Sequence, residues 1–216
     1  MATAFSDIPV WRRYEPAPLP AEALQRHETL IAGGSLVGLT IALDLAKKGH
    51  KVVILNRLDF VPAGSKAICY AKRTLEILDR LGVGDAMVEK GVVWEKGKVF
   101  WGDSEEPIYD YDLLPVKNQK MPAFINLQQY HAETILAEAL MKMPNAEIRW
   151  GHALTGVAQQ GDSVRVHVET AGGAYDIETG WLIACDGGRS TVRDLMGLEF
   201  EGRVFEDNFL IADIKM

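Results

Sequence analysis

Apolar positions change their period along the chain, and each change marks a predicted element. Residues 29–32 form a short apolar run that stops at a pair of glycines. Over residues 37–48 the apolar positions recur at helical spacing and end at Gly49, a usual helix-stop residue. A second apolar run, residues 51–55, is β-branched and too short for a helix. Strand, glycine turn, helix and strand in succession predict a βαβ unit with buried parallel strands.

Two further helices and a hairpin are predicted downstream. Residues 71–81 and 127–143 carry apolar stripes at helical spacing. Residues 92–114 contain two apolar runs around the polar segment 102–107, which predicts an antiparallel hairpin.

The last part of the chain alternates between apolar and polar residues. Runs at residues 147–150, 163–169 and 174–178 are separated by glycine turns, and this pattern predicts an antiparallel β-meander. Residues 181–185 are almost continuously apolar and predict one more buried strand.

Residues 1–28 differ from the rest in being rich in proline. We expect an extended N-terminal arm that ends in a short helix over residues 21–28. The remaining residues, 29–216, are expected to form one domain.

Composition narrows the class of protein. The chain has 216 residues, 48% hydrophobic and 25% charged, which is typical of a globular domain. Its net charge of −7 argues against a general nucleic-acid or anionic-membrane binder. No apolar run is long enough to span a bilayer. The two cysteines, Cys69 and Cys185, form no CxxC pair, so a reducing cytoplasm is the expected location.

The first candidate site is the glycine-containing turn between residues 33 and 38. In the dinucleotide fingerprint, glycines make a tight turn, admit a pyrophosphate and let the helix pack on the strand. Gly33 and Gly38 occupy the outer positions, and Ser35 replaces the middle glycine. Leu36 and Val37 open the helix, whose N-terminal N–H groups would face the phosphates. The alternative is an ordinary glycine-rich turn.

The second and third candidates follow two of the buried strands. Asn56 and Arg57 stand where an acidic residue usually binds ribose hydroxyls, and the alternative for Asn56 is a turn asparagine. Asp186 and Gly187 follow the strand at 181–185, at the end where open α/β sheets bind ligands. The alternative is a solvent-facing turn.

The sequence contains no motif for a metal site, a hydrolase nucleophile or a P-loop. The five histidines show no metal-ligand spacing, so no metal site is predicted. GxSxG and GxxxxGK[ST] are absent, which argues against a hydrolase elbow and a P-loop.

The three candidate segments, in this order, resemble the flavoprotein aromatic hydroxylases, single-component FAD monooxygenases of the phenol, hydroxybenzoate and hydroxyphenylpropionate type. The resemblance covers residues 29–216. It implies an α/β, Rossmann-like FAD/NAD(P)-binding fold with a parallel sheet and an inserted antiparallel meander. It also implies FAD as cofactor, NADPH or NADH as co-substrate, and hydroxylation of a small aromatic substrate with dioxygen.

The resemblance also implies roles for individual residues. Lys66, where the family has arginine, and Gln129 would lie nearer the flavin, while Asp186 and Gly187 would lie at the pyrophosphate. Residues 205–216, with the run 209–213, resemble the first strand of the substrate-domain sheet. At position 35, the Cβ would press on the pyrophosphate or the hydroxyl would donate to it.

Family members are roughly twice as long as this chain, so we expect a fragment truncated before the substrate domain is complete. Two alternatives remain for the function. The chain is a non-catalytic remnant or subunit that pairs with a second copy or a partner chain through its sheet edge, or it is an NAD(P)-dependent dehydrogenase.

Overall fold

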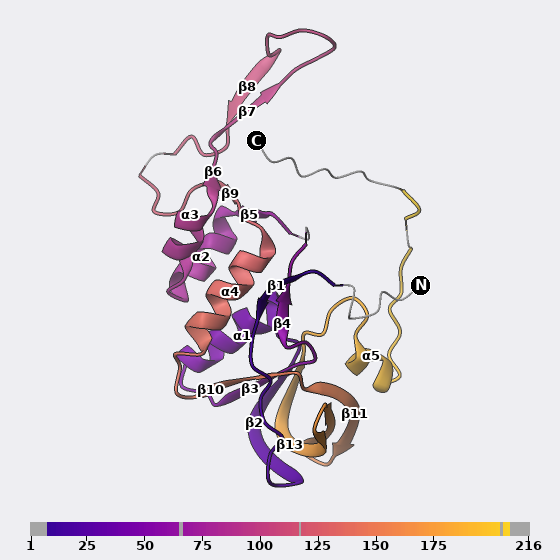
Figure 1. Cartoon of the computed structure of the whole chain (residues 1–216). Helices are drawn as coiled ribbons and strands as arrows, with labels where there is room; N and C mark the ends of the chain where they lie inside the picture. Colours follow the sequence, from indigo (N-terminus) through magenta and orange to yellow (C-terminus); the bar gives the residue numbers. More distant parts are fainter. Residues whose placement is uncertain (1–7, 65–66, 117, 204, 208–216) are drawn as a thin grey trace.

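A six-stranded mixed sheet forms the lower part of the fold as it is drawn in Figure 1. The computed structural model describes residues 8–64, 67–116, 118–203 and 205–207. In spatial order the strands of this sheet are β10 (Ala146–Trp150), β3 (Val52–Asn56), β2 (Leu24–Ala32), β13 (Gly173–Ala184), β12 (Ser163–Thr170) and β11 (Ala153–Gln160).

The first four strands of this order run parallel. Ala32 of β2 pairs with Leu55 of β3 on one side and with Ala184 of β13 on the other. Trp150 of β10 pairs with Asn56. The carboxyl ends of β2, β3 and β13 therefore meet at one edge of the sheet.

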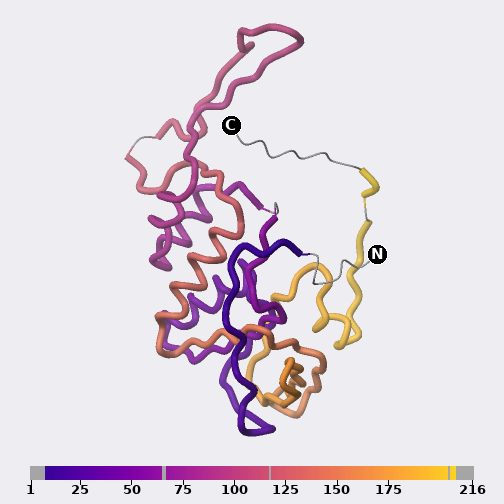
Figure 2. The backbone as a smooth tube through the Cα atoms, in the orientation of Figure 1, coloured from indigo at the N-terminus to yellow at the C-terminus, as the bar shows by residue number. Residues whose placement is uncertain are grey.

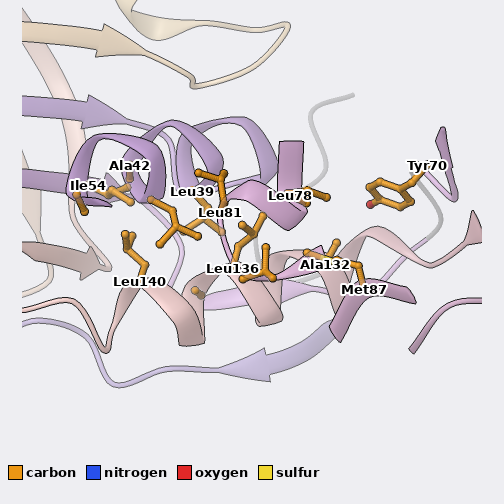
Figure 3. Packing of buried hydrophobic residues seen from close by; sticks show 14 of the residues in the cluster. Leu39, Ala42, Ile54, Tyr70, Leu78, Leu81, Met87, Ala132, Leu136 and Leu140 are labelled. Carbon is orange, nitrogen blue, oxygen red and sulfur yellow. The ribbon is translucent and has the colours of Figure 1, made fainter. Parts of the chain in front are cut away.

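Two helices, α1 (Leu36–Lys47) and α4 (Gln129–Leu140), lie against one face of the sheet, and two more, α2 (Lys72–Arg80) and α3 (Gly84–Lys90), extend the same helical core beyond them (Figure 1). Successive residues of a strand point to opposite faces, so Ile31 and Ile54 face these helices. Figure 3 shows Leu39, Leu136 and other apolar side chains packed together between these helices and the sheet.

The antiparallel strands β11, β12 and β13 cover part of the other face. Leu30 and Leu55, which alternate with the helix-facing residues, pack there against Val166, Val168 and Ile177. Both faces of β3 and of residues 29–32 of β2 are thus buried, which is why these segments are continuous apolar runs in the sequence.

Smaller elements surround this core. They are the pair β1 (Val10–Arg13) and β4 (Phe60–Pro62), the three strands β5 (Cys69–Ala71), β9 (Phe124–Asn126) and β6 (Val92–Val93), the hairpin β7 (Lys96–Val99) and β8 (Tyr109–Asp112), and helix α5 (Thr191–Leu195). The β7–β8 hairpin projects away from the rest of the chain (Figure 2). None of the described helices is long and apolar enough to cross a membrane.

The α/β fold class and the βαβ unit are confirmed, but the short helix expected over residues 21–28 is wrong. Strand β2 already begins at Leu24, and its first half pairs with β13 from Asp176 to Thr179. These sheet hydrogen bonds override the local helical preference. The proline-rich segment before it is extended, as expected, and Tyr14 stacks on Trp150 with ring centroids 4.3 Å apart.

The meander is present, but its strands differ from the prediction. Residues 147–150 belong to β10, a parallel strand, and the meander instead begins at β11, which the alternation did not reveal. The runs at 174–178 and 181–185 form one strand, β13, which pairs with β12 through its first half and with β2 along most of its length. The hairpin around residues 102–107 is confirmed. The strand expected over 209–213 lies outside the described residues.

Candidate functional site

A cleft of about 610 Å³ opens at the edge where the parallel strands end. The glycine loop, the end of β3 and the end of β13 form its walls. Of the predicted site residues, those that line it are Gly33, Ser35, Val37, Asn56, Arg57, Asp186 and Gly187. The three segments that the sequence singled out therefore lie around one cavity.

The glycine loop is pressed against the end of β13. A Cβ on Gly33 would lie 2.4 Å from the carbonyl oxygen of Cys185, and the residue has φ of +106°. A Cβ on Gly38 would lie 1.9 Å from the Gly33 carbonyl oxygen. Side chains at these two positions would displace backbone, so the approach of α1, β2 and β13 requires glycine.

Asn56 braces this loop from the end of β3. Its Oδ1 accepts from the Gly34 N–H at 3.3 Å, and its Nδ2 donates to the Leu58 carbonyl at 2.9 Å. An aspartate at position 56 would lack the Nδ2 donor and could not make the bond to Leu58. Asn56 therefore joins the glycine loop to the turn after β3, in addition to lining the cleft.

The N-terminus of α1 lies at the cleft without a side-chain cap. Ser35 is its N-cap residue and makes no capping hydrogen bond, while Val37 in the first turn is 62% exposed. The first N–H groups of an α-helix have no partner inside the helix and carry its positive dipole end. This arrangement can accept a negatively charged group.

The Ser35 hydroxyl is instead engaged with α4. It donates to Oε1 of Glu133 at 2.6 Å, and Nε2 of Gln129 donates to the same oxygen at 2.6 Å. Glu133 is 3% exposed, and no Lys, Arg or His in the described ranges forms an ion pair with it. Burial, and then the negative charge of Glu133, raise the pKa of Tyr70 to about 12.

The turn after β13 is held by hydrogen bonds to the start of helix α5. Asp186 accepts from the Ser190 hydroxyl at 2.6 Å and from the Val192 N–H at 3.1 Å. Ser190 in turn caps α5 by accepting from the Arg193 N–H at 3.1 Å. Gly187 has φ of +93°, and no atom lies within 4 Å of the position that a Cβ would take there, so its backbone is open to a ligand.

Two arginines and one cysteine also line the cleft. Arg57 and Arg189 line the cleft with cationic side chains. Burial, and then the neighbouring Asp186 carboxylate, raise the pKa of the Cys185 thiol, which keeps it protonated and unreactive.

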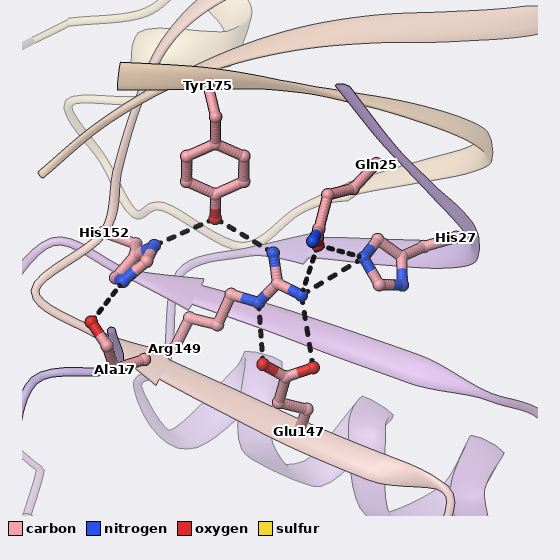
Figure 4. A network of polar contacts seen from close by, with 7 residues as sticks. All are labelled: Ala17, Gln25, His27, Glu147, Arg149, His152 and Tyr175. Carbon is pink, nitrogen blue, oxygen red and sulfur yellow. Dashed lines mark hydrogen bonds and ion pairs between the residues drawn. The ribbon is translucent and has the colours of Figure 1, made fainter. Parts of the chain in front are cut away.

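A buried polar network lies behind the cleft wall (Figure 4). Arg149 donates to Tyr175 Oη at 3.0 Å and to Glu147 Oε1 at 2.8 Å. His152, which lines the cleft, contacts the same Tyr175 oxygen at 2.9 Å and the Ala17 carbonyl at 2.9 Å. Burial is the main cause that lowers the pKa of His152. The network joins the arm, β10 and β13 beneath the cleft.

Three predicted residues lie behind the cleft rather than in its wall, and one cannot be placed. Leu36 packs against the helical core, Gly38 is buried under Gly33, and Gln129 is half-buried against Glu133. Lys66 lies outside the described residues.

The sequence prediction missed Glu133 and His152. Glu133 stands four residues after Gln129 on a predicted helix, so the two share a face, and this spacing was the available signal. Nothing local to His152 indicated its place, because its partners lie in the arm and in β13.

Comparison with known proteins identifies the family. Residues 26–216 match a family described as FAD binding domain. The chain belongs to this FAD-binding family. It is 32% identical over 186 residues to para-nitrophenol 4-monooxygenase from Pseudomonas sp. strain WBC-3, covering 86% of this chain and 46% of that protein.

Two further similar proteins agree with this match. The chain is 28% identical over 204 residues to a probable NADH-specific resorcinol 4-hydroxylase from Rhodococcus jostii, covering 91% of this chain and 37% of that protein. The crystal structure of p-nitrophenol 4-monooxygenase PnpA from Pseudomonas putida DLL-E4 superposes with a TM-score of 0.77 at 33% identity. That superposition covers 84% of this chain and 46% of PnpA. The resemblance to flavoprotein aromatic hydroxylases is confirmed, and the chain spans less than half the length of these relatives.

The cleft fits the cofactor of this family. FAD carries a diphosphate, and the cleft offers an uncapped helix N-terminus, glycines at close backbone approaches and two arginines. The two acidic side chains that line it, Glu133 and Asp186, each already accept hydrogen bonds from neighbouring elements. The residues present are thus suited to a dinucleotide.

Proposed function

We propose that this chain forms the FAD-binding part of a flavoprotein monooxygenase that hydroxylates a phenolic ring with NADH or NADPH and dioxygen. The observation that carries the proposal is the meeting of the glycine loop, Asn56 and the Asp186–Gly187 turn around one cleft. The names of the nitrophenol and resorcinol enzymes support an aromatic substrate, and the second name supports a nicotinamide reductant. Those names also weigh against an NAD(P)-dependent dehydrogenase.

The diphosphate of FAD would lie at the first turn of α1. Gly33 and Gly38 allow the backbone to approach it, and Leu36 anchors the helix in the core. The backbone N–H groups of the N-cap residue Ser35 and of Val37 in the first turn would donate to phosphate oxygens.

Other residues would bind the two ends of the cofactor. Asn56 and Arg57 would bind the ribose end, and their position in the cleft wall at the end of β3 supports this. The open backbone of Gly187, in the turn that Asp186 stabilises, would bind the pyrophosphate. Gln129 and Lys66 would lie towards the flavin, with Gln129 acting through Glu133 rather than by direct contact.

FAD, when bound, supplies the redox chemistry and the activation of dioxygen. The residues of this chain bind and orient it, and none is assigned as a catalytic acid or base. Large exposed side chains, Trp101 at 79%, Trp181 at 70% and Phe200 at 81%, support burial by a second copy or a further polypeptide. A cytoplasmic location is proposed with it, since both described cysteines are free thiols.

Flavin binding tests this proposal. The purified chain is expected to retain the visible absorbance of bound FAD, or to quench flavin fluorescence on titration with FAD. Mixing the complex with NADH or NADPH without oxygen is expected to bleach the absorbance when the remainder of the enzyme is supplied. A folded chain that binds no FAD would reject the proposal.

A further inference from the structure

The N-cap serine of α1 does not cap its helix. Ser35 has the extended backbone of an N-cap residue, with φ of −95° and ψ of −173°. Serine is favoured at this position because its Oγ accepts a hydrogen bond from a first-turn N–H. Here the side chain makes no such bond and donates to Oε1 of Glu133 at 2.6 Å instead.

Glu133 is held in place for this contact. It is 3% exposed, and Gln129, one turn earlier on α4, donates to the same oxygen at 2.6 Å. The Gln129 amide is itself oriented, because its Oε1 accepts from the Ala67 N–H at 3.3 Å. The backbone N–H of Gln129 also donates to the Ala67 carbonyl at 3.1 Å. The acceptor for Ser35 is therefore fixed from the side of α4.

Ser35 Oγ is held on the α4 side, where it donates to Oε1 of Glu133 and accepts from Nε2 of Gln129 at 3.4 Å. A hydroxyl can donate and accept at once, but in this rotamer Oγ makes no bond to a first-turn N–H of α1. A rotamer that caps the helix in place of these contacts leaves Glu133. A buried carboxylate would then lose one of its hydrogen bonds, which is unfavourable. The first turn of α1 thus stays uncapped at the cleft while Glu133 and Gln129 hold the Ser35 hydroxyl.

We propose that Glu133 is a positioning residue, which withdraws the Ser35 side chain from the helix cap and leaves the first-turn N–H groups of α1 to the diphosphate of the bound dinucleotide. The proposal rests on the proposed function. It assigns a reason to serine at the middle glycine position, because its hydroxyl is turned away from the ligand. In this proposal the hydroxyl would stay with Glu133 and the pyrophosphate would bind the backbone N–H groups instead.

A charge effect must be separated from this role. A carboxylate near a diphosphate repels it, so any neutral residue at position 133 changes the electrostatics as well as the hydrogen bond. Glu133→Gln and Glu133→Leu remove the same charge. Only glutamine keeps an acceptor for the Ser35 hydroxyl, so the difference between these two variants isolates the acceptor.

The experiment measures two quantities in both variants, each with Ser35 and with Ser35→Ala. The first is the hydrogen-exchange rate of the Val37 and Gly38 amides without ligand, and the second is the Kd for FAD. With Ser35 present, E133L is expected to exchange these amides about fivefold more slowly than E133Q and to bind FAD about fivefold more weakly, the equivalent of one N-cap bond. With Ser35→Ala, which cannot cap, both differences are expected to disappear.

The outcomes separate this proposal from the proposed function. Equal exchange and equal Kd in E133L and E133Q would overturn it, as would a difference that persists with Ser35→Ala. If the unsubstituted chain binds no FAD, the proposed function fails, and the exchange rates alone decide whether Glu133 controls the cap. Glu133→Met, which also lacks a strong acceptor, replaces E133L if thermal unfolding shows that the leucine variant does not fold.

Discussion

The amide nitrogen of Asp186 lies 2.9 Å from the position that a Cβ on Gly33 would take. Strands β2 and β13 run parallel side by side, so their carboxyl ends bring these two turns together although they are far apart in the sequence. Close backbone packing at Gly33 thus joins the glycine loop to the Asp186–Gly187 turn. The candidate dinucleotide site depends on this close packing.

Gly33→Ala is expected to destabilise the chain strongly. The added Cβ would meet the backbone of Cys185 at 2.4 Å, and φ of +106° is unfavourable for alanine. Strain and displacement together predict a loss of about 2–4 kcal/mol in the free energy of unfolding, measured with urea. The matched control is Gly49→Ala, with φ of +91° and nothing within 4 Å, which should lose about 1 kcal/mol. Equal losses in both variants would show that the close contact is not required.

Tyr70→Phe is expected to preserve or increase stability. The Tyr70 hydroxyl is buried and, within the described residues, has no hydrogen-bond partner. Removing it relieves an unsatisfied buried group, a gain of about 1 kcal/mol. Tyr175→Phe is the control, because that hydroxyl contacts both Arg149 and His152, and its loss should cost about 1–3 kcal/mol. Thermal unfolding of the two variants measures the contrast, and a destabilised Y70F would contradict it.

Asp186→Ala is expected to loosen α5 as well as the cleft. The substitution removes acceptors for the Ser190 hydroxyl and the Val192 N–H. Loss of a cap bond of this kind costs about 1–2 kcal/mol, so the Val192 amide should exchange faster. Ser190→Ala serves as the comparison, since it removes the cap to Arg193 but keeps the Asp186 bond to Val192. If Val192 exchange is unchanged in D186A, the carboxylate does not hold this helix.

Stability is expected to fall as the pH is lowered through the histidine range. Burial, and then the nearby Arg149 guanidinium, lower the pKa of His27, and burial likewise lowers the pKa of His152. The unfolded chain therefore takes up protons at these two groups at a higher pH than the folded chain does. The contribution of these two histidines to the free energy of unfolding is complete above the unfolded histidine pKa of about 6.5. It is lost as the pH falls from there towards the lower folded pKa.

Urea unfolding between about pH 7.5 and pH 5.5, a range that brackets the unfolded histidine pKa, measures this dependence. A variant with glutamine at both positions, His27→Gln and His152→Gln, should show a shallower slope of unfolding free energy against pH, even if its stability is lower throughout. An identical slope in that variant would show that other groups cause the pH dependence.

The βαβ unit could be predicted from the sequence because its signals are local. Apolar runs of the right length, a glycine turn and a helix that ends before Gly49 are all patterns among residues close in sequence. The structure has α1 at Leu36–Lys47, where this pattern predicts a helix. Gly33, Asn56 and Asp186 also line one cleft. Parallel strands that share a sheet bring their ends to one edge, so recognising the strands was enough to place these three turns together.

Other features were decided only by the tertiary structure, because their partners are distant in the sequence. Residues 24–28 have a helical preference, but hydrogen bonds to β13 make them a strand. Ser35 is typical of a helix cap, but its hydroxyl donates to a glutamate 98 residues away instead. Local pattern specifies which residues can form an element or a polar contact. The choice among competing partners depends on which of them the packed sheet and helices bring within hydrogen-bond distance.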